Sequence, residues 1–243
     1  MRLPYDAMNA PTDESAVPVV LVHGWAGSFE STWQRSGFTD LLADARRPVI
    51  GIDLLGHGNA PKPHDAASYV DLTDRVFEAM PAEPVDAIGF SMGALTLLRC
   101  AVRQPHRFRR LVLGGIGRNA FDTPSEDRAE DFANAIQFGA DPVDKQASAF
   151  ASYARAPGND PVALAMAMRT AEQRRFRPEE LTVVTCPTLV AIGDQDFAGP
   201  GDVLVDALPN ATLTVLRNTD HFATPESFAF IDAALEFIGA VPS

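Results

Sequence analysis

A serine near the middle of the sequence carries the clearest chemical signal. Ser91 is the central residue of Gly89-Phe90-Ser91-Met92-Gly93, which follows a short apolar run and opens a helical pattern. A serine at such a sharp strand-to-helix turn has strained backbone angles, and its hydroxyl stands clear of the sheet. Glycines flank it because side chains there would collide with the adjoining strand and helix. The helix N-terminus behind Ser91 favours the negative charge that develops on an attacked carbonyl oxygen. Together these features make Ser91 the candidate nucleophile.

A serine nucleophile needs a base, and the sequence contains five histidines. His221 lies just beyond the last apolar run and before the C-terminal helical pattern. Catalytic groups gather beyond the carboxyl ends of parallel strands, which favours His221 as the base. His57, between two glycines, is interpreted as a residue that shapes its loop. The remaining histidines are His23, at a strand end, and His64 and His106, in polar loops where we expect solvated side chains.

The imidazole in turn needs a carboxylate to orient it, and two candidates lie in Gly193-Asp194-Gln195-Asp196. Asp196 is further into the loop, where it can turn back toward His221, and it is the preferred candidate. Asp194 follows the strand end directly, where carboxylates often brace the loop backbone, and it remains the alternative. Asp220 precedes the histidine and points elsewhere if His221 faces inward, so we interpret it as structural.

Negative charge on the attacked carbonyl oxygen needs two hydrogen-bond donors. One is expected to be the backbone N–H of Met92, the residue after the nucleophile. The other is expected from the loop His23-Gly24-Trp25, where the backbone N–H of Trp25 is the candidate. Because both donors belong to the backbone, a side-chain change at Met92 should be better tolerated than one at Ser91.

Six short apolar runs predict the strands that must position these residues. They are apolar on both faces, as expected for strands buried in a parallel sheet. The runs cover residues 17–22, 48–53, 85–90, 111–116, 188–192 and 211–216. Helical patterns between them cover residues 38–46, 69–80 and 92–103, and a last helix is predicted from a cap at Thr224, with Pro225 first in the helix, to about Gly239. This alternation predicts an α/β fold with a doubly wound, mostly parallel sheet.

One segment, residues 118–178, breaks this alternation. It contains no convincing strand and three helix starts of one type, a cap residue followed by proline: Thr123-Pro124, Asp141-Pro142 and Asp160-Pro161. The segment is therefore interpreted as a helical insertion. The expected organisation is a core of residues 1–117 and 179–243 interrupted by this insertion.

Composition excludes several other classes of protein. The chain has 243 residues, and 46% of them are hydrophobic, so it can bury a core. Its formal charge of −12 makes the surface repel nucleic acid and anionic lipid. Cys100 and Cys186 form no metal-ligand or CxxC pattern and are interpreted as free thiols. There is no apolar run of about 18 residues and no secretion signal, which makes a cytoplasmic location the expectation. No metal or organic cofactor is expected, and the oligomeric state is not readable from the sequence.

The combination of these motifs resembles the α/β-hydrolase fold family over most of the chain. The likeness rests on four segments in the expected order: His23-Gly24-Trp25, the stretch from Asp53 to Gly58, the turn at Ser91, and Gly193 to Asp196 followed by His221. The family places the acid three residues after a glycine like Gly193, which supports Asp196. It implies that residues 118–178 form a helical cap (lid) over the site. It also usually has an antiparallel strand pair at the start, for which the few residues before position 17 leave little room.

The resemblance also implies a class of reaction, and it is greatest to serine carboxylesterases. The expected activity is cleavage of a small or medium carboxylic ester through an acyl-enzyme on Ser91. Lactonases, carbon–carbon bond hydrolases, cofactor-free perhydrolases and ligand-sensing homologues that are not enzymes keep the same site and remain alternatives. Trp25, Phe197 and Phe222 are the substrate-binding candidates because each is adjacent to a site residue. Other apolar side chains of the insertion, Phe121, Phe132, Phe138, Phe150, Met166 and Met168, either face the site or pack the insertion together.

Overall fold

A sheet of six strands forms the centre of the computed structural model, which describes residues 17–122, 126–139, 145–170 and 175–241. The strand order is β2-β1-β3-β4-β5-β6, and every neighbouring pair is parallel. The strands are β1 (Val19–Val22), β2 (Val49–Ile52), β3 (Val85–Phe90), β4 (Phe108–Gly114), β5 (Thr188–Gly193) and β6 (Ala211–Leu216). The predicted doubly wound α/β fold is therefore confirmed. The described strands contain no antiparallel pair, and residues 1–16 lie outside the described ranges.

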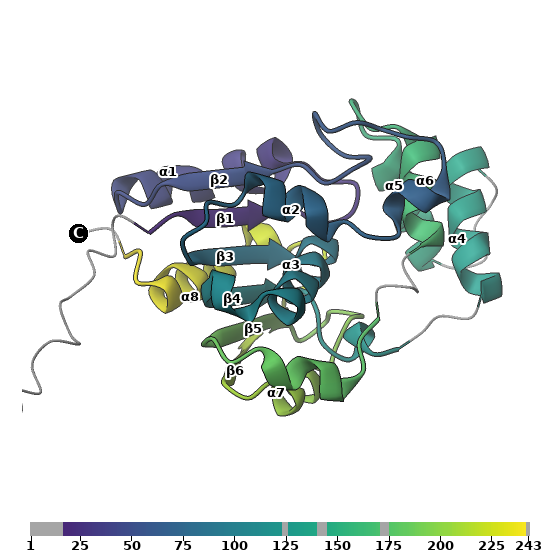
Figure 1. The fold of residues 1–243 in the computed structure, drawn as a ribbon. Helices are drawn as coiled ribbons and strands as arrows, with labels where there is room; N and C mark the ends of the chain where they lie inside the picture. The colour runs from purple at the N-terminus through teal and green to yellow at the C-terminus, as the bar shows by residue number, and fades with distance from the viewer. Residues whose placement is uncertain (1–16, 123–125, 140–144, 171–174, 242–243) are drawn as a thin grey trace, which may run out of the picture.

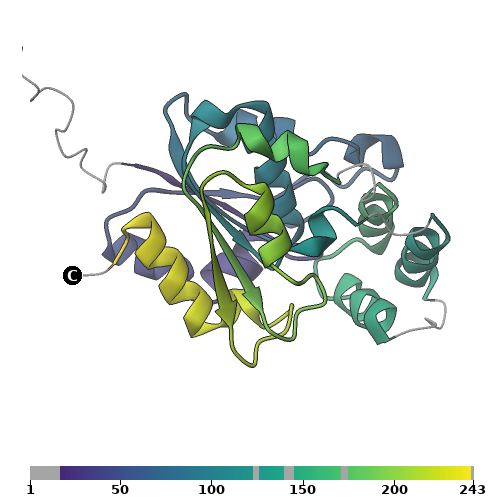
Figure 2. The same ribbon diagram turned by 90° about the horizontal axis from the view of Figure 1, so that it is seen from below.

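Helices cover both faces of the sheet (Figures 1 and 2). One face carries α1 (Phe38–Asp44) and α8 (Phe228–Ile238), and the other carries α2 (Thr73–Ala79), α3 (Met92–Arg103) and α7 (Asp202–Ala207). Shorter helices connect these elements: a π-helix at Glu30–Gln34 and 3-10 turns at Ala66–Tyr69, Pro105–Arg107, Arg118–Ala120, Pro178–Val183 and Thr224–Glu226. No described helix is long and apolar enough to cross a bilayer.

The apolar runs follow from having helices on both faces. In β1, Val20 and Val22 enter the core beneath α2 and α3, whereas Val19 and Leu21 enter the core beneath α1 and α8. Successive side chains of a strand point to opposite faces, so a strand covered on both faces is expected to be mainly apolar. The same expectation is wrong for β2 and β6, which are partly exposed because they form the two edges of the sheet.

Strand β4 begins at Phe108, three residues before the predicted run at 111–116, and ends at Gly114. The predicted run does not include the first three residues of the strand, because the charged Arg109 and Arg110 are not typical of a buried strand. The structure explains them: the Arg109 guanidinium is 3.0 Å from the buried carboxylate of Asp86, and Arg110 donates to the carbonyl of Ile238 at 2.7 Å. Charged side chains that reach such partners are compatible with a strand position.

Two helices begin later than their patterns predict. Helix α2 starts at Thr73, because residues 66–69 form a separate 3-10 turn. Helix α8 starts at Phe228, and Thr224 is not its cap: the Thr224 hydroxyl donates to the carbonyl of Asp220 at 2.9 Å. Pro225 opens only the 3-10 turn Thr224–Glu226, and the extended backbone of Ser227 (ψ 124°) separates that turn from α8.

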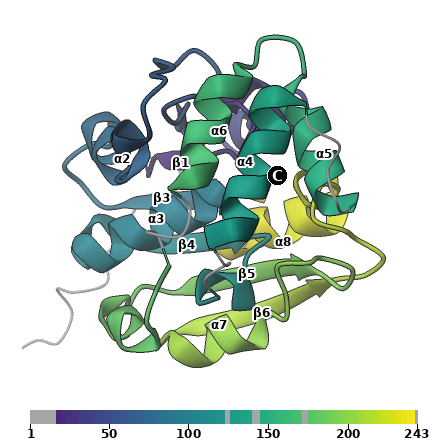
Figure 3. The ribbon, with the colours of Figure 1, turned by 90° about the vertical axis from the view of Figure 1, so that its right-hand side faces the viewer.

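The described residues between β4 and β5 include three α-helices, α4 (Glu126–Phe138), α5 (Lys145–Ala154) and α6 (Pro161–Arg169). Figure 3 shows them in front of the carboxyl ends of the strands. The start predicted at Asp160-Pro161 is confirmed, because the Asp160 carboxylate accepts from the N–H groups of Val162 and Ala163 and Pro161 is the first helical residue. The starts predicted at Thr123-Pro124 and Asp141-Pro142 lie outside the described residues.

Strands β1 and β3 are neighbours although β2 separates them in sequence, so the direction of winding reverses between them. A crevice forms outside the carboxyl ends of the strands at such a reversal, because the two loops leave in opposite directions. The loop after β1 and the turn after β3 therefore meet at one place. Those are the segments that contain Trp25 and Ser91.

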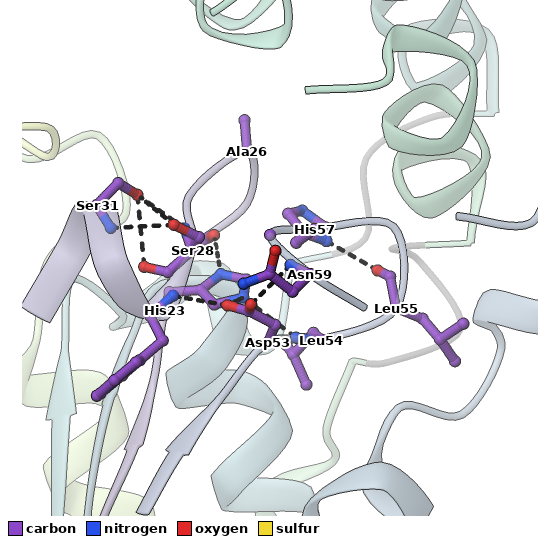
Figure 4. Close-up of polar contacts among 12 residues, drawn as sticks. His23, Ala26, Ser28, Ser31, Asp53, Leu54, Leu55, His57 and Asn59 are labelled. Atoms are coloured by element: carbon purple, nitrogen blue, oxygen red, sulfur yellow. Dashed lines mark hydrogen bonds and ion pairs between the residues drawn. The ribbon is translucent and has the colours of Figure 1, made fainter. Parts of the chain in front are cut away.

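A buried histidine fixes the loop after β1 (Figure 4). His23 accepts from the backbone N–H of Leu54 through Nε2 at 3.1 Å, so its proton is on Nδ1, which donates to the carbonyl of Gly24 at 2.7 Å. Both ring nitrogens of the neutral form are thus satisfied. Burial lowers the pKa of His23, while the Gly24 hydrogen bond and nearby Asp53 oppose that shift.

Asp53, which directly follows β2, also connects the loop after β1 with the loop after β2. One carboxylate oxygen accepts from the N–H of Phe29 at 2.7 Å and the other accepts from the N–H of Asn59 at 2.8 Å. The loops after β1 and β2 are therefore tied together by one imidazole and one carboxylate (Figure 4).

We predict that His23 contributes to a decrease in the free energy of unfolding as the pH falls. The pKa of His23 is lowered in the folded protein, so below about pH 6.5 the unfolded chain binds a proton that the folded chain does not. Stability from this group is complete above about pH 6.5 and is lost as the pH falls, by at most about 1.4 kcal/mol per pH unit. We expect the free energy of unfolding in urea to decline less from about pH 7.5 to 5.0 in His23→Asn than in the wild type. The exposed His106→Asn serves as the control and should decline like the wild type, and equal slopes for all three proteins would contradict this role of His23.

Candidate active site

Ser91 lies at the junction of β3 and α3 with a backbone conformation that is rare for a residue with a side chain. Its φ is 50° and its ψ is −115°, and its N–H donates to the carbonyl of Gly114 at 2.8 Å. Two glycines make this turn possible. A Cβ on Gly89 would lie 2.7 Å from the backbone of Ala94, and a Cβ on Gly93 would lie 2.3 Å from the carbonyl oxygen of Val22. No real Cβ contact is that short, so α3 can approach β1 and β3 this closely only without side chains there.

The structure brings the predicted nucleophile, base and acid into one chain of hydrogen-bond contacts. Nε2 of His221 is 2.9 Å from Oγ of Ser91, and Nδ1 of His221 is 2.9 and 3.0 Å from the two carboxylate oxygens of Asp196. The imidazole is almost completely buried, and the Asp196 side chain is fully buried. The three side chains come from the loops after β3, β5 and β6. Their distances fit a base that removes the serine proton while a carboxylate holds its tautomer.

The other acids near these contacts have different partners. One oxygen of Asp194 accepts from the N–H of Thr219 at 3.3 Å, so this carboxylate braces the loop after β6. Asp220 accepts from the N–H of Ala223 at 2.9 Å within its own turn. Asp196 is the acid that the structure places against the imidazole of His221.

The remaining histidines lie away from Ser91 or are held by backbone groups. His57 is buried, and its Nδ1 is 2.8 Å from the carbonyl oxygen of Leu55, which agrees with a role in shaping the loop. His64 is not simply solvated, since its Nε2 is 2.8 Å from the carboxylate of Asp160 at the start of α6. His106 is exposed.

The backbone segments that contain the two predicted oxyanion donors, Met92 and Trp25, lie next to Ser91. Met92 is the first residue of α3, and the first N–H groups of a helix have no intrahelical acceptor. The loop after β1 passes close by, since a Cβ on Gly24 would lie 3.4 Å from Cβ of Ser91. The carbonyl of Gly24 accepts from His23 and from the N–H of Gly27, and the N–H of Trp25 points opposite to that carbonyl in a trans peptide.

Aromatic rings surround the imidazole on the side of α5. The ring of Phe197 is 4.3 Å from that of His221, and the ring of Phe222 is 5.6 Å from it. Phe150 of α5 lies 5.2 Å from Trp25, 6.1 Å from Phe197 and 5.9 Å from Phe222. The three aromatic candidates from the sequence therefore meet around Phe150 of α5.

Other apolar side chains of residues 118–178 have different surroundings. Phe132 contacts Phe150, and Met168 packs against the cluster between α4, α5 and α6. Met166 packs against both that cluster and the main core, and Phe121 packs against the main core. Phe138 is 70% exposed. Tyr153 of α5, which the sequence did not single out, stacks on Phe222 at 4.7 Å. No motif marks it, because its place depends on how α5 is packed.

Within the described ranges, no three histidine, cysteine, aspartate or glutamate residues gather in a way that could hold a metal ion. Cys100 and Cys186 are both buried as free thiols, and burial raises the pKa of each, which makes the reactive thiolate unfavourable.

Comparison with known proteins identifies the family to which this fold belongs. Residues 17–139 match a family model described as the alpha/beta hydrolase fold. A pimeloyl-[acyl-carrier protein] methyl ester esterase of Neisseria meningitidis is 30% identical and aligns with 84% of this chain and 85% of its own length. A 2-hydroxy-6-oxo-2,4-heptadienoate hydrolase of Pseudomonas putida is 36% identical over 40% of this chain and 37% of its own. The solved structure of a 2-hydroxy-6-oxo-6-phenylhexa-2,4-dienoate hydrolase from Rhodococcus superimposes with a TM-score of 0.67 over 93% of this chain and 92% of that chain, at 23% identity. The sheet order, the glycine-flanked turn at Ser91 and these matches together show that the chain belongs to the α/β-hydrolase fold family.

Proposed function

We propose that this protein is a serine hydrolase that cleaves small or medium carboxylic esters through an acyl-enzyme on Ser91. The observation that carries the proposal is the line of contacts from Ser91 through the buried imidazole of His221 to Asp196. A hydroxyl in that arrangement can lose its proton as it attacks a carbonyl carbon. The relative named as a methyl ester esterase supports esters as the substrate class.

The two half-reactions use the same groups. Nε2 of His221 accepts the Ser91 proton as Oγ bonds to the carbonyl carbon, and the carbonyl electron pair moves to oxygen. The backbone N–H groups of Met92 and Trp25 donate to that oxyanion. His221 then gives its proton to the leaving alcohol as the ester bond breaks, which leaves the acyl group on Ser91. Water attacks the acyl-enzyme with His221 again as base, and the products are a carboxylic acid and free Ser91.

The organisation of the site extends the proposal to substrate binding. We propose that residues 118–178 form a cap and that residues 1–117 and 179–243 form the hydrolase core. Helices α4 to α6 lie in front of the carboxyl ends of the strands (Figure 3). The rings of Trp25, Phe197 and Phe222 converge on Phe150 of this segment, and they would accommodate an apolar acyl or alcohol group.

Hydrolysis of a carbon–carbon bond is a second candidate, because a hydrolase of a heptadienoate is among the relatives. The same serine, base and oxyanion donors would serve that reaction. The two candidates differ in what the wild-type enzyme turns over: simple alkyl and aryl esters in the first case, vinylogous diketo acids in the second.

The direct test of the proposed function is hydrolysis of an ester series by the wild type and by Ser91→Ala. Methyl esters and p-nitrophenyl esters from acetate to long acyl chains should be hydrolysed, with a best chain length that reflects the size of the pocket. Loss of the nucleophile should lower kcat by about 10⁶, as in the best-studied serine hydrolase. Circular dichroism should show the same fold in both proteins. If the wild type hydrolysed none of these esters but cleaved a vinylogous diketo acid, the esterase proposal would be wrong and the second candidate would take its place.

The two acids of the loop after β5 offer a matched pair for a second test. Asp196→Asn turns an acceptor into a donor beside Nδ1 of His221 and stabilises the wrong tautomer, for which a loss of about 10⁴ in kcat is typical. Asp194→Asn keeps an oxygen that can accept from the N–H of Thr219, so we expect activity close to the wild type. Steady-state kinetics on one ester measures both. Equal losses in the two variants, or a larger loss in Asp194→Asn, would contradict the role given to Asp196.

A further inference from the structure

The loop that contains Trp25 is held from two sides, and only one of them belongs to the core. On the core side, His23 donates to the carbonyl of Gly24 at 2.7 Å. On the other side, two contacts come from the segment at and before α6. The side-chain Nδ2 of Asn159 donates to the carbonyl of Ala26 at 3.0 Å, and the indole Nε1 of Trp25 donates to the carbonyl of Leu164 at 3.2 Å.

Ala26 needs such support because its backbone is strained. Its φ is 60°, in the left-handed region that residues with a Cβ rarely adopt. Such conformations persist only where the surroundings over-determine them, and they gather at functional sites. Ala26 lies at the tip of the loop, away from the contacts of His23 and Asp53 (Figure 4), and its carbonyl accepts from the side chain of Asn159.

The amide of asparagine matches the two acceptors at this position. The amide nitrogen of Asn159 has two hydrogens, and the structure gives it two acceptors, the carbonyl of Ala26 and the carbonyl of Tyr153, each at 3.0 Å. The amide thus connects the end of α5, the start of α6 and the loop after β1. A carboxylate has no donor, and a hydroxyl has only one.

These contacts act on the Gly24–Trp25 peptide, through the carbonyl of Gly24, and on the Ala26–Gly27 peptide, through the carbonyl of Ala26. His23 sets the plane of the Gly24–Trp25 peptide through its carbonyl, and with it the direction of the Trp25 N–H. The conformation of the next two residues is set by Asn159 through the Ala26 carbonyl and by Leu164 through the indole. If both were released, the strained turn could relax and rotate the Trp25 N–H away from Ser91.

We propose that Asn159 is a positioning residue of the oxyanion site, which holds the backbone N–H of Trp25 toward Ser91 when α6 is in place. The proposal rests on the proposed function, since it gives Asn159 a role in stabilising the oxyanion of ester hydrolysis. It makes the inserted helices part of the catalytic geometry, in addition to any contact they make with substrate. Asn159 does not touch the reacting atoms.

The kinetic test compares Asn159→Ala and Asn159→Asp with His64→Ala. His64 binds Asp160, the next residue along the chain, so His64→Ala removes a neighbouring contact between the core and α6 without touching the Trp25 loop. Loss of a whole oxyanion donor typically costs about 10²–10³ in kcat, and a misdirected donor should cost from about 10-fold up to that limit. We expect this fall in kcat in both Asn159 variants, largest in Asn159→Asp, with KM changed much less. His64→Ala should keep the wild-type kcat. A rise in KM alone, or the same fall in His64→Ala, would overturn the proposal.

A second readout does not depend on activity. The chain has two tryptophans, Trp25 and Trp33, so labelling with ¹⁵N-tryptophan gives two backbone amide signals and two indole signals. Trp25→Phe identifies the pair that belongs to Trp25, and the fully buried Trp33 reports on the integrity of the core. We expect the backbone amide signal of Trp25 to shift in Asn159→Asp, the Trp33 signals to stay, and neither pair to move in His64→Ala.

The two readouts separate the possible failures. An unmoved Trp25 amide in a folded Asn159→Asp protein would overturn the positioning role, whatever the kinetics. A wild type that hydrolyses no ester would overturn the proposed function, and the shift of the Trp25 amide would then decide alone whether Asn159 positions the loop.

Discussion

The close approach of α3 to β1 and β3 is the constraint on which the site depends. It places Ser91 at a turn with φ of 50°, and it is possible because Gly89 and Gly93 leave room for the backbones of Ala94 and Val22. The turn directs the Ser91 hydroxyl away from the sheet, and it puts the free N–H of Met92 beside it. Any side chain at either glycine would move the helix, and the hydroxyl and the donor would move with it.

The parallel sheet brings the remaining groups to that turn. The order β2-β1-β3-β4-β5-β6 sets the loops after β5 and β6 on one side of Ser91 and the loop after β1 on the other. Asp196 and His221 come from the first two loops, and Trp25 comes from the third. The segment of α5 and α6 completes the surroundings, with Phe150 near the aromatic rings and Asn159 on the carbonyl of Ala26.

Much of this could be predicted from the sequence because local patterns encode it. Buried parallel strands are mainly apolar, and the glycines around Ser91 mark the turn. Other features depend on distant partners and leave no local pattern. The charged start of β4 is stabilised by Asp86 and Ile238. Asn159 lies before a recognisable helix start, but its bond to Ala26 spans 133 positions of sequence. Tyr153 likewise meets Phe222 only through the packing of α5.

The central claim is that Ser91 is a nucleophile activated by His221. It is tested most directly by treating the folded protein with a fluorophosphonate, which forms a stable adduct with an activated serine as fluoride leaves. Intact-mass spectrometry followed by peptide mapping should show one adduct on the wild type, located on Ser91. Under the same conditions, His221→Ala should remain unlabelled. An unlabelled wild type, an adduct on another residue, or equally fast labelling of His221→Ala would contradict the account.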